Sequence, residues 1–324
     1  MKKIILLLAL FLVIFFPHSV SAQGQVLGIH LLSPHEIKEV KNFFYEPSDD
    51  WSYVTIPLSL ADLDKKTEWA EFFQLAKEYK LIPLVRLTTS FEAGAWKVPN
   101  RKEITSYFDF LNQFSWPSEE RYVIVFNEVN HAKEWGNSID PIQYAQVLAF
   151  TSDWAHSENK NYKILPAAMD LAAPNGYDTM EAFNYLDKMY KYDPDIFQKL
   201  DYWNSHSYPN PGFSSSPTRT GKNSLRGFHY ELNYLKNKTG LELEVFITET
   251  GWVSNKYNNR WLSNYYTYAL QHIWSDERVK GVTVFVLRGD PGPFAEFGFL
   301  DSNNQPTNQY FAVKKAIKNV QKEL

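Results

Sequence analysis

The sequence predicts a single (β/α)8 barrel, and three observations support this prediction. Short apolar runs bounded by turn residues recur along the chain, the gaps between them are long enough for helices, and the runs are continuously apolar, as buried parallel strands are. They begin roughly 30 to 40 residues apart, enough for a helix to return the chain to the same end of a parallel sheet. The eight predicted strands are 26–32, 53–56, 82–87, 122–126, 162–168, 202–206, 244–248 and 282–287.

Amphipathic segments fill the gaps between these runs. The clearest is 67–80, where Trp69, Phe72, Phe73 and Ala76 recur at the spacing of one helix face. Further helices are predicted at 101–114, 141–156, 180–190, 225–235, 260–274 and 308–322. A doubly wound open sheet is the alternative, but it would more often carry a glycine-rich turn after its first strand, and "VLGIHLLSP" has none.

The N-terminus predicts export. Lys2 and Lys3 precede an apolar run over 4–16 and a small-residue stretch that ends at Ala22, which is the pattern of a secretory signal peptide. We therefore expect a signal peptide at 1–22, a barrel catalytic domain at 23–324, and a secreted protein, extracellular or periplasmic. The alternative is an uncleaved anchor, but the run is shorter than the roughly 20 residues of a spanning helix, so we expect no stable membrane insertion after cleavage.

Composition excludes several classes of function. The chain has no cysteine, which rules out disulfides, thiol nucleophiles and thiolate metal sites, so a hydrophobic core must supply its stability. A net charge of −4 argues against a nucleic-acid partner. Aromatic residues make up 16% of the chain, which fits stacking against sugars. The histidines show no metal-ligand spacing, so we expect no metal site. We also expect no cofactor and a monomer.

Two glutamates mark the predicted strand ends. Glu128 follows the fourth strand in "YVIVFNE", and Glu249 follows the seventh in "EVFITE". Side chains at the C-terminal ends of barrel strands converge on one mouth, even when they are far apart in sequence. Glycosidic cleavage requires such a pair, in which one carboxyl protonates the departing oxygen and the other attacks or stabilises the sugar cation. At about 5 Å their repulsion is roughly 3 kcal/mol for an effective dielectric near 20, so one of them should hold a proton near neutral pH.

The motifs "FNEVN" and "ITETGW" resemble those of the clan A glycoside hydrolases, which are retaining enzymes built on this barrel. The resemblance implies that Glu128 is the acid/base, Glu249 the nucleophile, and Asn127 the donor to the sugar 2-hydroxyl. "NSHSYP" is similar to the His-x-Tyr element of the clan, which implies His206 beside the acid/base and Tyr208 beside the nucleophile. A half-buried histidine in a capped loop is the alternative for that element.

Two departures from the clan pattern stand out. The clan usually has a tryptophan floor after the eighth strand, where this sequence offers "VFVLRGDPG"; Trp252 and Trp135 are candidates to replace it, although either could simply be packing. The clan often has an arginine near the end of the second strand, and Arg86 on the third strand is our candidate substitute, with a structural ion pair as the alternative.

These features predict a secreted retaining β-glycoside hydrolase that acts on poly- or oligosaccharides. The alternatives are a non-catalytic carbohydrate-binding barrel, suggested by the missing tryptophan, and a transglycosidase. The substrate stays open, because "TETGW" resembles β-1,3-glucanases whereas "NEVNH" looks more like xylosidases or cellulases.

Overall fold

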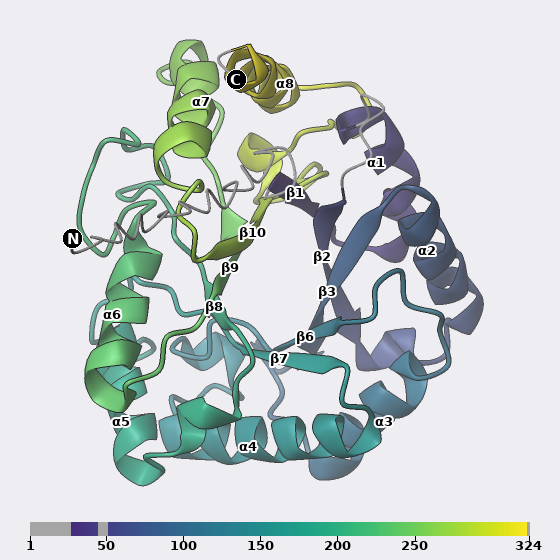
Figure 1. The fold of residues 1–324 in the computed structure, drawn as a ribbon, viewed down its shortest axis with the longest axis vertical. Helices are drawn as coiled ribbons and strands as arrows, with labels where there is room; N and C mark the ends of the chain where they lie inside the picture. Colours follow the sequence, from purple (N-terminus) through teal and green to yellow (C-terminus); the bar gives the residue numbers. More distant parts are fainter. Residues whose placement is uncertain (1–26, 45–50, 323–324) are drawn as a thin grey trace, which may run out of the picture.

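The structure is a computed structural model that describes residues 27–44 and 51–322. Within these ranges, eight parallel strands lie at the centre and helices surround them (Figure 1). The barrel strands are β1 (Leu27–His30), β2 (Ser52–Ser59), β3 (Leu81–Thr88), β6 (Arg121–Val125), β7 (Tyr162–Pro166), β8 (Trp203–Ser205), β9 (Val245–Thr250) and β10 (Val279–Val284). The (β/α)8 prediction is confirmed, with all eight strands close to their expected places.

The sheet closes almost completely. Its strand order is β7-β6-β3-β2-β1-β10-β9-β8, with neighbouring strands hydrogen-bonded in parallel. The two edge strands meet through an isolated parallel bridge between Asp170 and His206 and through the Asn204 amide, which donates to the Pro166 carbonyl at 3.0 Å. The C-terminal ends of all eight strands therefore surround one mouth.

Seven predicted helices are present with small boundary shifts, and one helix was missed. The observed helices are α2 (Lys66–Glu78), α3 (Arg101–Leu111), α4 (Pro141–Glu158), α5 (Ala182–Tyr192), α6 (Gly227–Thr239), α7 (Leu262–His272) and α8 (Asn308–Gln321). The missed helix is α1 (Ile37–Phe44), which follows a short 3-10 turn, η1 (Pro34–Glu36). At two turns, α1 is too short to show a clear periodic pattern.

An aromatic cluster fills the N-terminal end of the barrel interior. Tyr53 packs edge-to-face against Phe246 at 5.1 Å, and Tyr122 packs against the same ring at 5.1 Å. Gly281 makes room for this layer, because a Cβ there would lie 2.6 Å from the Tyr53 ring and 3.0 Å from the Phe246 ring. Above the cluster, the hydroxyls of Thr55 and Thr283 hydrogen-bond at 2.7 Å. With this end filled, the free space of the barrel lies at the C-terminal mouth.

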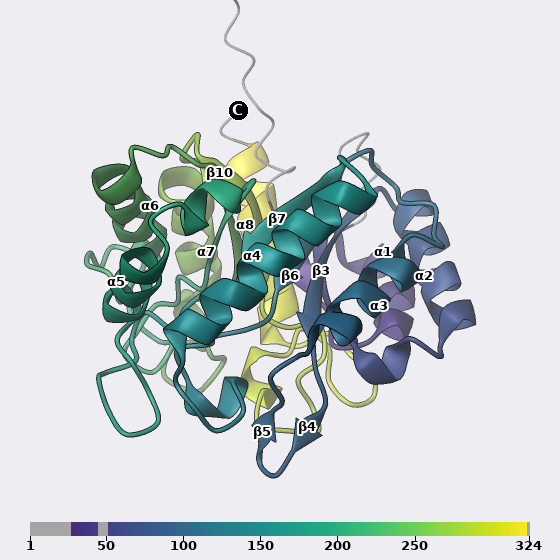
Figure 2. The same ribbon diagram turned by 90° about the horizontal axis from the view of Figure 1, so that it is seen from below.

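A short hairpin extends the mouth. After β3 the chain forms β4 (Phe91–Glu92) and β5 (Ala95–Trp96), an antiparallel pair that projects beyond the barrel end in Figure 2. The two-residue turn between these strands places Ala93 and Gly94 at φ of 50° and 84°, as tight hairpin turns require. No predicted element covered this hairpin.

Candidate active site

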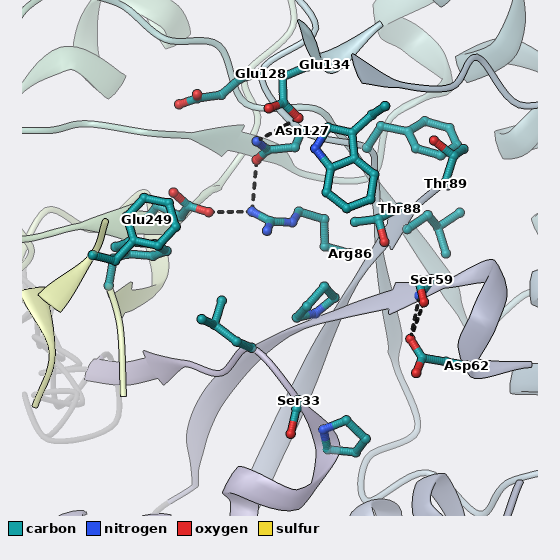
Figure 3. Close-up of a pocket in the computed structure, with 18 of the residues that line it drawn as sticks. Ser33, Ser59, Asp62, Arg86, Thr88, Thr89, Asn127, Glu128, Glu134 and Glu249 are labelled. Carbon is teal, nitrogen blue, oxygen red and sulfur yellow. Dashed lines mark hydrogen bonds and ion pairs between the residues drawn. The ribbon is translucent and has the colours of Figure 1, made fainter. Parts of the chain in front are cut away.

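A cavity of about 860 Å³ opens at the C-terminal ends of the barrel strands. Both glutamates singled out from the sequence line it, together with Asn127 and Arg86 (Figure 3). Tyr208 also lines it, so residues from β3, β6, β8 and β9 and their following loops come together at one site. The cavity is walled partly by phenylalanines, namely Phe126, Phe213, Phe285, Phe294 and Phe297.

Glu249 lies on β9 and is contacted by side chains from β1, from β3 and from the loop after β8. The Arg86 guanidinium Nη1 hydrogen-bonds its Oε1, the His30 Nε2 lies 3.3 Å from the same oxygen, and the Tyr208 hydroxyl donates to Oε2 at 3.2 Å. Burial alone would raise the pKa of Glu249, but the positive charges of His206 and Arg86 outweigh it and hold that pKa well below its usual range. Glu249 is therefore an ionised carboxylate at neutral pH, although its side chain is only 10% exposed.

Glu128 occupies a strained backbone position just beyond β6. Its φ is 33° and that of Phe126 is 72°, in the left-handed region that residues other than glycine rarely adopt. Such conformations cost of order 1 to 3 kcal/mol each and cluster at functional sites. Here they bring the Glu128 side chain to the cavity, where it is 25% exposed and lies 2.8 Å from the Nδ1 of His206.

His206 links the two glutamates. Its Nδ1 is 2.8 Å from the Glu128 Oε1 and 3.9 Å from the Glu249 Oε2. These two carboxylate oxygens are therefore at most about 7 Å apart, the sum of the two distances, compared with separations of about 5 to 5.5 Å in retaining and 6.5 to 9.5 Å in inverting glycosidases. Burial lowers the pKa of His206, but the charge of Glu249 and the hydrogen bond to Glu128 raise it above its usual value.

Asn127 is fixed between a cation and an anion. Its Oδ1 accepts a 2.9 Å hydrogen bond from Arg86, and its Nδ2 donates to Glu134 at 3.4 Å. Glu134 lies on a 3-10 turn, η3 (Ala132–Glu134), and also lines the cavity. Burial, followed by the negative charge of Glu128, raises the pKa of Glu134. The amide orientation of Asn127 is thus set by its two neighbours.

The two tryptophans proposed as replacement platforms do not serve that role. Trp252 and Trp135 are 0% and 1% exposed, and their indole N–H groups donate to Ser215 and Gln143 inside the protein. Neither ring offers a face to a ligand, so the expectation from the sequence was wrong and the packing alternative holds. At the eighth strand, Phe285 follows β10 directly and lines the cavity.

Three residues near the glutamates were missed from the sequence: His30, Glu134 and Phe285. His30 ends β1, and its position at a strand end was a readable signal. Glu134 lies in a loop with no local pattern that separates it from a solvated glutamate. Phe285 falls inside the apolar run predicted as the eighth strand. In the structure this strand ends at Val284, so Phe285 is the first residue after it.

Across the described ranges, His, Asp and Glu side chains form no group of three or more that could hold a metal ion. Within the same ranges, none of the helices has the length and apolar character needed to cross a membrane. The predicted signal peptide, 1–22, lies outside the described residues.

A parallel barrel with paired carboxylates in its mouth is the architecture of glycoside hydrolases. The chain belongs to the family described as the glycosyl hydrolase catalytic core, whose model matches residues 87–311. The sequence-based assignment to this group of enzymes is therefore confirmed, and the chain is a glycoside hydrolase catalytic domain. No curated protein matches it in sequence.

Solved structures of glycosidases share the fold. A family 39 glycoside hydrolase from Bacteroides cellulosilyticus WH2 is 15% identical with a TM-score of 0.60, and the match covers 91% of this chain and 64% of that one. An endo-β-1,4-glucanase from Xanthomonas axonopodis pv. citri is 14% identical with a TM-score of 0.57, covering 91% and 99%. Xylanase 10B from Thermotoga maritima is 13% identical with a TM-score of 0.53, covering 94% and 98%.

Proposed function

We propose that this protein is a secreted retaining β-glycoside hydrolase that cleaves poly- or oligosaccharides by double displacement. The observation that supports cleavage by two carboxyl groups most strongly is the position of His206 between the two glutamates, which limits the separation of their nearest oxygens to about 7 Å. The retaining outcome rests on the resemblance of "FNEVN" and "ITETGW" to the clan A motifs. Secretion rests on the N-terminal sequence pattern alone.

In the first step, Glu249 attacks the anomeric carbon while Glu128, in its protonated form, gives its proton to the departing glycosidic oxygen. The C–O bond to the leaving group breaks and an ester to Glu249 forms. Arg86, His30 and Tyr208 hold the attacking carboxylate in one orientation before reaction.

In the second step, Glu128 removes a proton from water, and the resulting hydroxide attacks the same carbon. The ester bond breaks, Glu249 regains its charge, and the sugar leaves with its original configuration. Asn127 is positioned to donate to the sugar 2-hydroxyl, since Arg86 occupies its Oδ1 and leaves the amide N–H groups for Glu134 and a ligand.

The non-catalytic alternative rested on the absent tryptophan after the eighth strand. Phe285 lines the cavity at that position and packs edge-to-face on His30 at 5.2 Å, so an aromatic ring is present where the clan pattern needs one. The ring is only 6% exposed, so it offers part of its edge to the cavity, and its presence removes the reason given for the non-catalytic alternative.

The stereochemistry of the product tests the proposal. A panel of aryl β-glycosides and β-linked oligosaccharides would be screened, and the first-formed anomer followed by ¹H NMR. We expect the β-anomer first and slow mutarotation afterwards. A first-formed α-anomer would show an inverting mechanism and contradict the proposal. Glu128→Gln should lose activity, with azide restoring turnover of a substrate with a good leaving group, because azide needs no general base.

A further inference from the structure

Trp96 is the one tryptophan among the residues that line the described cavity. It ends the β4–β5 hairpin and is half-buried, whereas Trp135 and Trp252 are fully buried. A half-buried indole in a cavity wall can expose a face to a ligand, and the apolar C–H face of a pyranose is the surface that stacks on such a ring.

The hairpin is held rigidly, so Trp96 has a defined position. The Trp96 carbonyl accepts a 2.7 Å hydrogen bond from Gly136 on the loop after β6, and the Asn137 amide donates to the Ala93 carbonyl at 3.2 Å. At the hairpin base, the Thr89 hydroxyl donates to the Lys97 carbonyl at 2.6 Å. Gly136 has a φ of 61°, and a Cβ there would lie 3.0 Å from a Val98 methyl, so this position favours glycine.

The same loop supplies a carboxyl group to this corner of the cavity. Glu134 is two residues before the glycine that binds Trp96, and it contacts Asn127, which is fixed to Arg86 beside the nucleophile. Both Trp96 and Glu134 line the cavity, and together they provide what a pyranose needs: a ring face that stacks on its C–H face and a carboxyl group that accepts from its hydroxyls.

We propose that Trp96 and Glu134 form a second sugar subsite next to the reacting sugar, so that the preferred substrate is a β-linked oligosaccharide or polysaccharide rather than a monosaccharide glycoside. The inference rests on the proposed function for the identity of the ligand, because it takes the cavity to be the glycosidase site. Trp96 lies on the hairpin and not at a strand end, so the strand-end motifs do not indicate it.

Binding to a protein that cannot turn over tests the subsite. In a Glu128→Gln background, affinities for β-1,3- and β-1,4-linked tetrasaccharides and for the matching monosaccharides would be measured by isothermal titration calorimetry. Trp96→Ala should weaken tetrasaccharide binding about tenfold and monosaccharide binding by less. Trp96→Phe should recover part of the lost affinity, because phenylalanine keeps an aromatic face. If Trp96 only supported the hairpin, affinity would not rise with the size of the ring at this position.

Trp261→Ala is the matched control. Trp261 is 44% exposed and does not line the cavity, so its removal should leave tetrasaccharide affinity unchanged. Equal affinities for the Trp96→Ala and parent proteins would overturn the subsite, as would failure of the parent to bind any tetrasaccharide. The readout is binding, so it is separate from turnover. If tetrasaccharides bind through Trp96 but the wild-type protein does not hydrolyse them, the proposed function fails and the subsite stands.

Discussion

Arg86→Met removes the cation that touches both the nucleophile and Asn127. Arg86 is buried, and its Nη1 bonds both Glu249 and the Asn127 Oδ1, so the substitution keeps much of the side-chain volume and deletes both interactions. Two unit charges 4 Å apart attract by about 4 kcal/mol at an effective dielectric near 20. His206 still lies beside the carboxylate in the variant and compensates in part.

The sign of the expected change follows from the charge removed. Arg86 lowers the pKa of Glu249, so without it the carboxylate takes up a proton at higher pH. We expect the acid limb of the kcat/KM profile to move to higher pH, and kcat/KM at the optimum to fall about 100-fold, equivalent to about 3 kcal/mol of transition-state stabilisation.

The assay is a pH–rate profile with an aryl β-glycoside substrate, with circular dichroism to confirm folding. Arg121→Met is the control, because Arg121 begins β6 at the opposite end of the barrel and should leave the profile unchanged. An unchanged acid limb in Arg86→Met, or one displaced to lower pH, would refute the electrostatic role given to Arg86.

Three further predictions concern other parts of the molecule. Tyr208→Phe removes the hydroxyl that donates to Glu249, and kcat/KM should fall about tenfold or more in steady-state assays. The circular dichroism spectrum should be unchanged. An unchanged kcat/KM would show that this hydrogen bond does not contribute to catalysis. Glu231 on α6 is fully buried, accepts from Ser205, and has a pKa raised by burial to about 7. The unfolded chain loses this proton near its ordinary pKa while the folded protein keeps it, so stability falls as pH rises from about 4.5 to 7, by up to about 3 kcal/mol. Glu231→Gln should therefore raise Tm at pH 8 by more than at pH 4.5, and equal Tm changes at both would contradict this. Gly136→Ala forces a Cβ against Val98 at a left-handed φ and should lower the free energy of unfolding by about 1 to 3 kcal/mol in urea titrations, whereas Gly94→Ala, also left-handed but with open space around it, should cost less.

The sequence predicted the barrel because its strands are buried on both faces and therefore read as continuous apolar runs. It also located Glu128 and Glu249, because the C-terminal ends of all barrel strands face the same mouth. Helix α1 was missed since two turns give too few periodic positions, and Trp135 and Trp252 were misjudged because exposure depends on neighbours that no local pattern reveals.

The remaining site residues depend on contacts between distant segments. His30 belongs to the site because β1 lies next to β10, which in turn pairs with β9. Glu134 belongs to it because Asn127 turns toward it, and nothing in "HAKEWG" distinguishes it from a surface glutamate. The hairpin that carries Trp96 could have been found, since "FEAGAW" sets a two-residue turn between two aromatic residues.

The most direct measurement is covalent trapping of the nucleophile. The protein would be incubated with activated 2-deoxy-2-fluoro β-glycosides, digested with a protease, and the labelled peptide sequenced by tandem mass spectrometry. We expect one fluorosugar per chain, attached to Glu249, and a slower rate of labelling in Arg86→Met. A fluorosugar attached to any other side chain would contradict the assignment of Glu249 as the group that attacks the sugar.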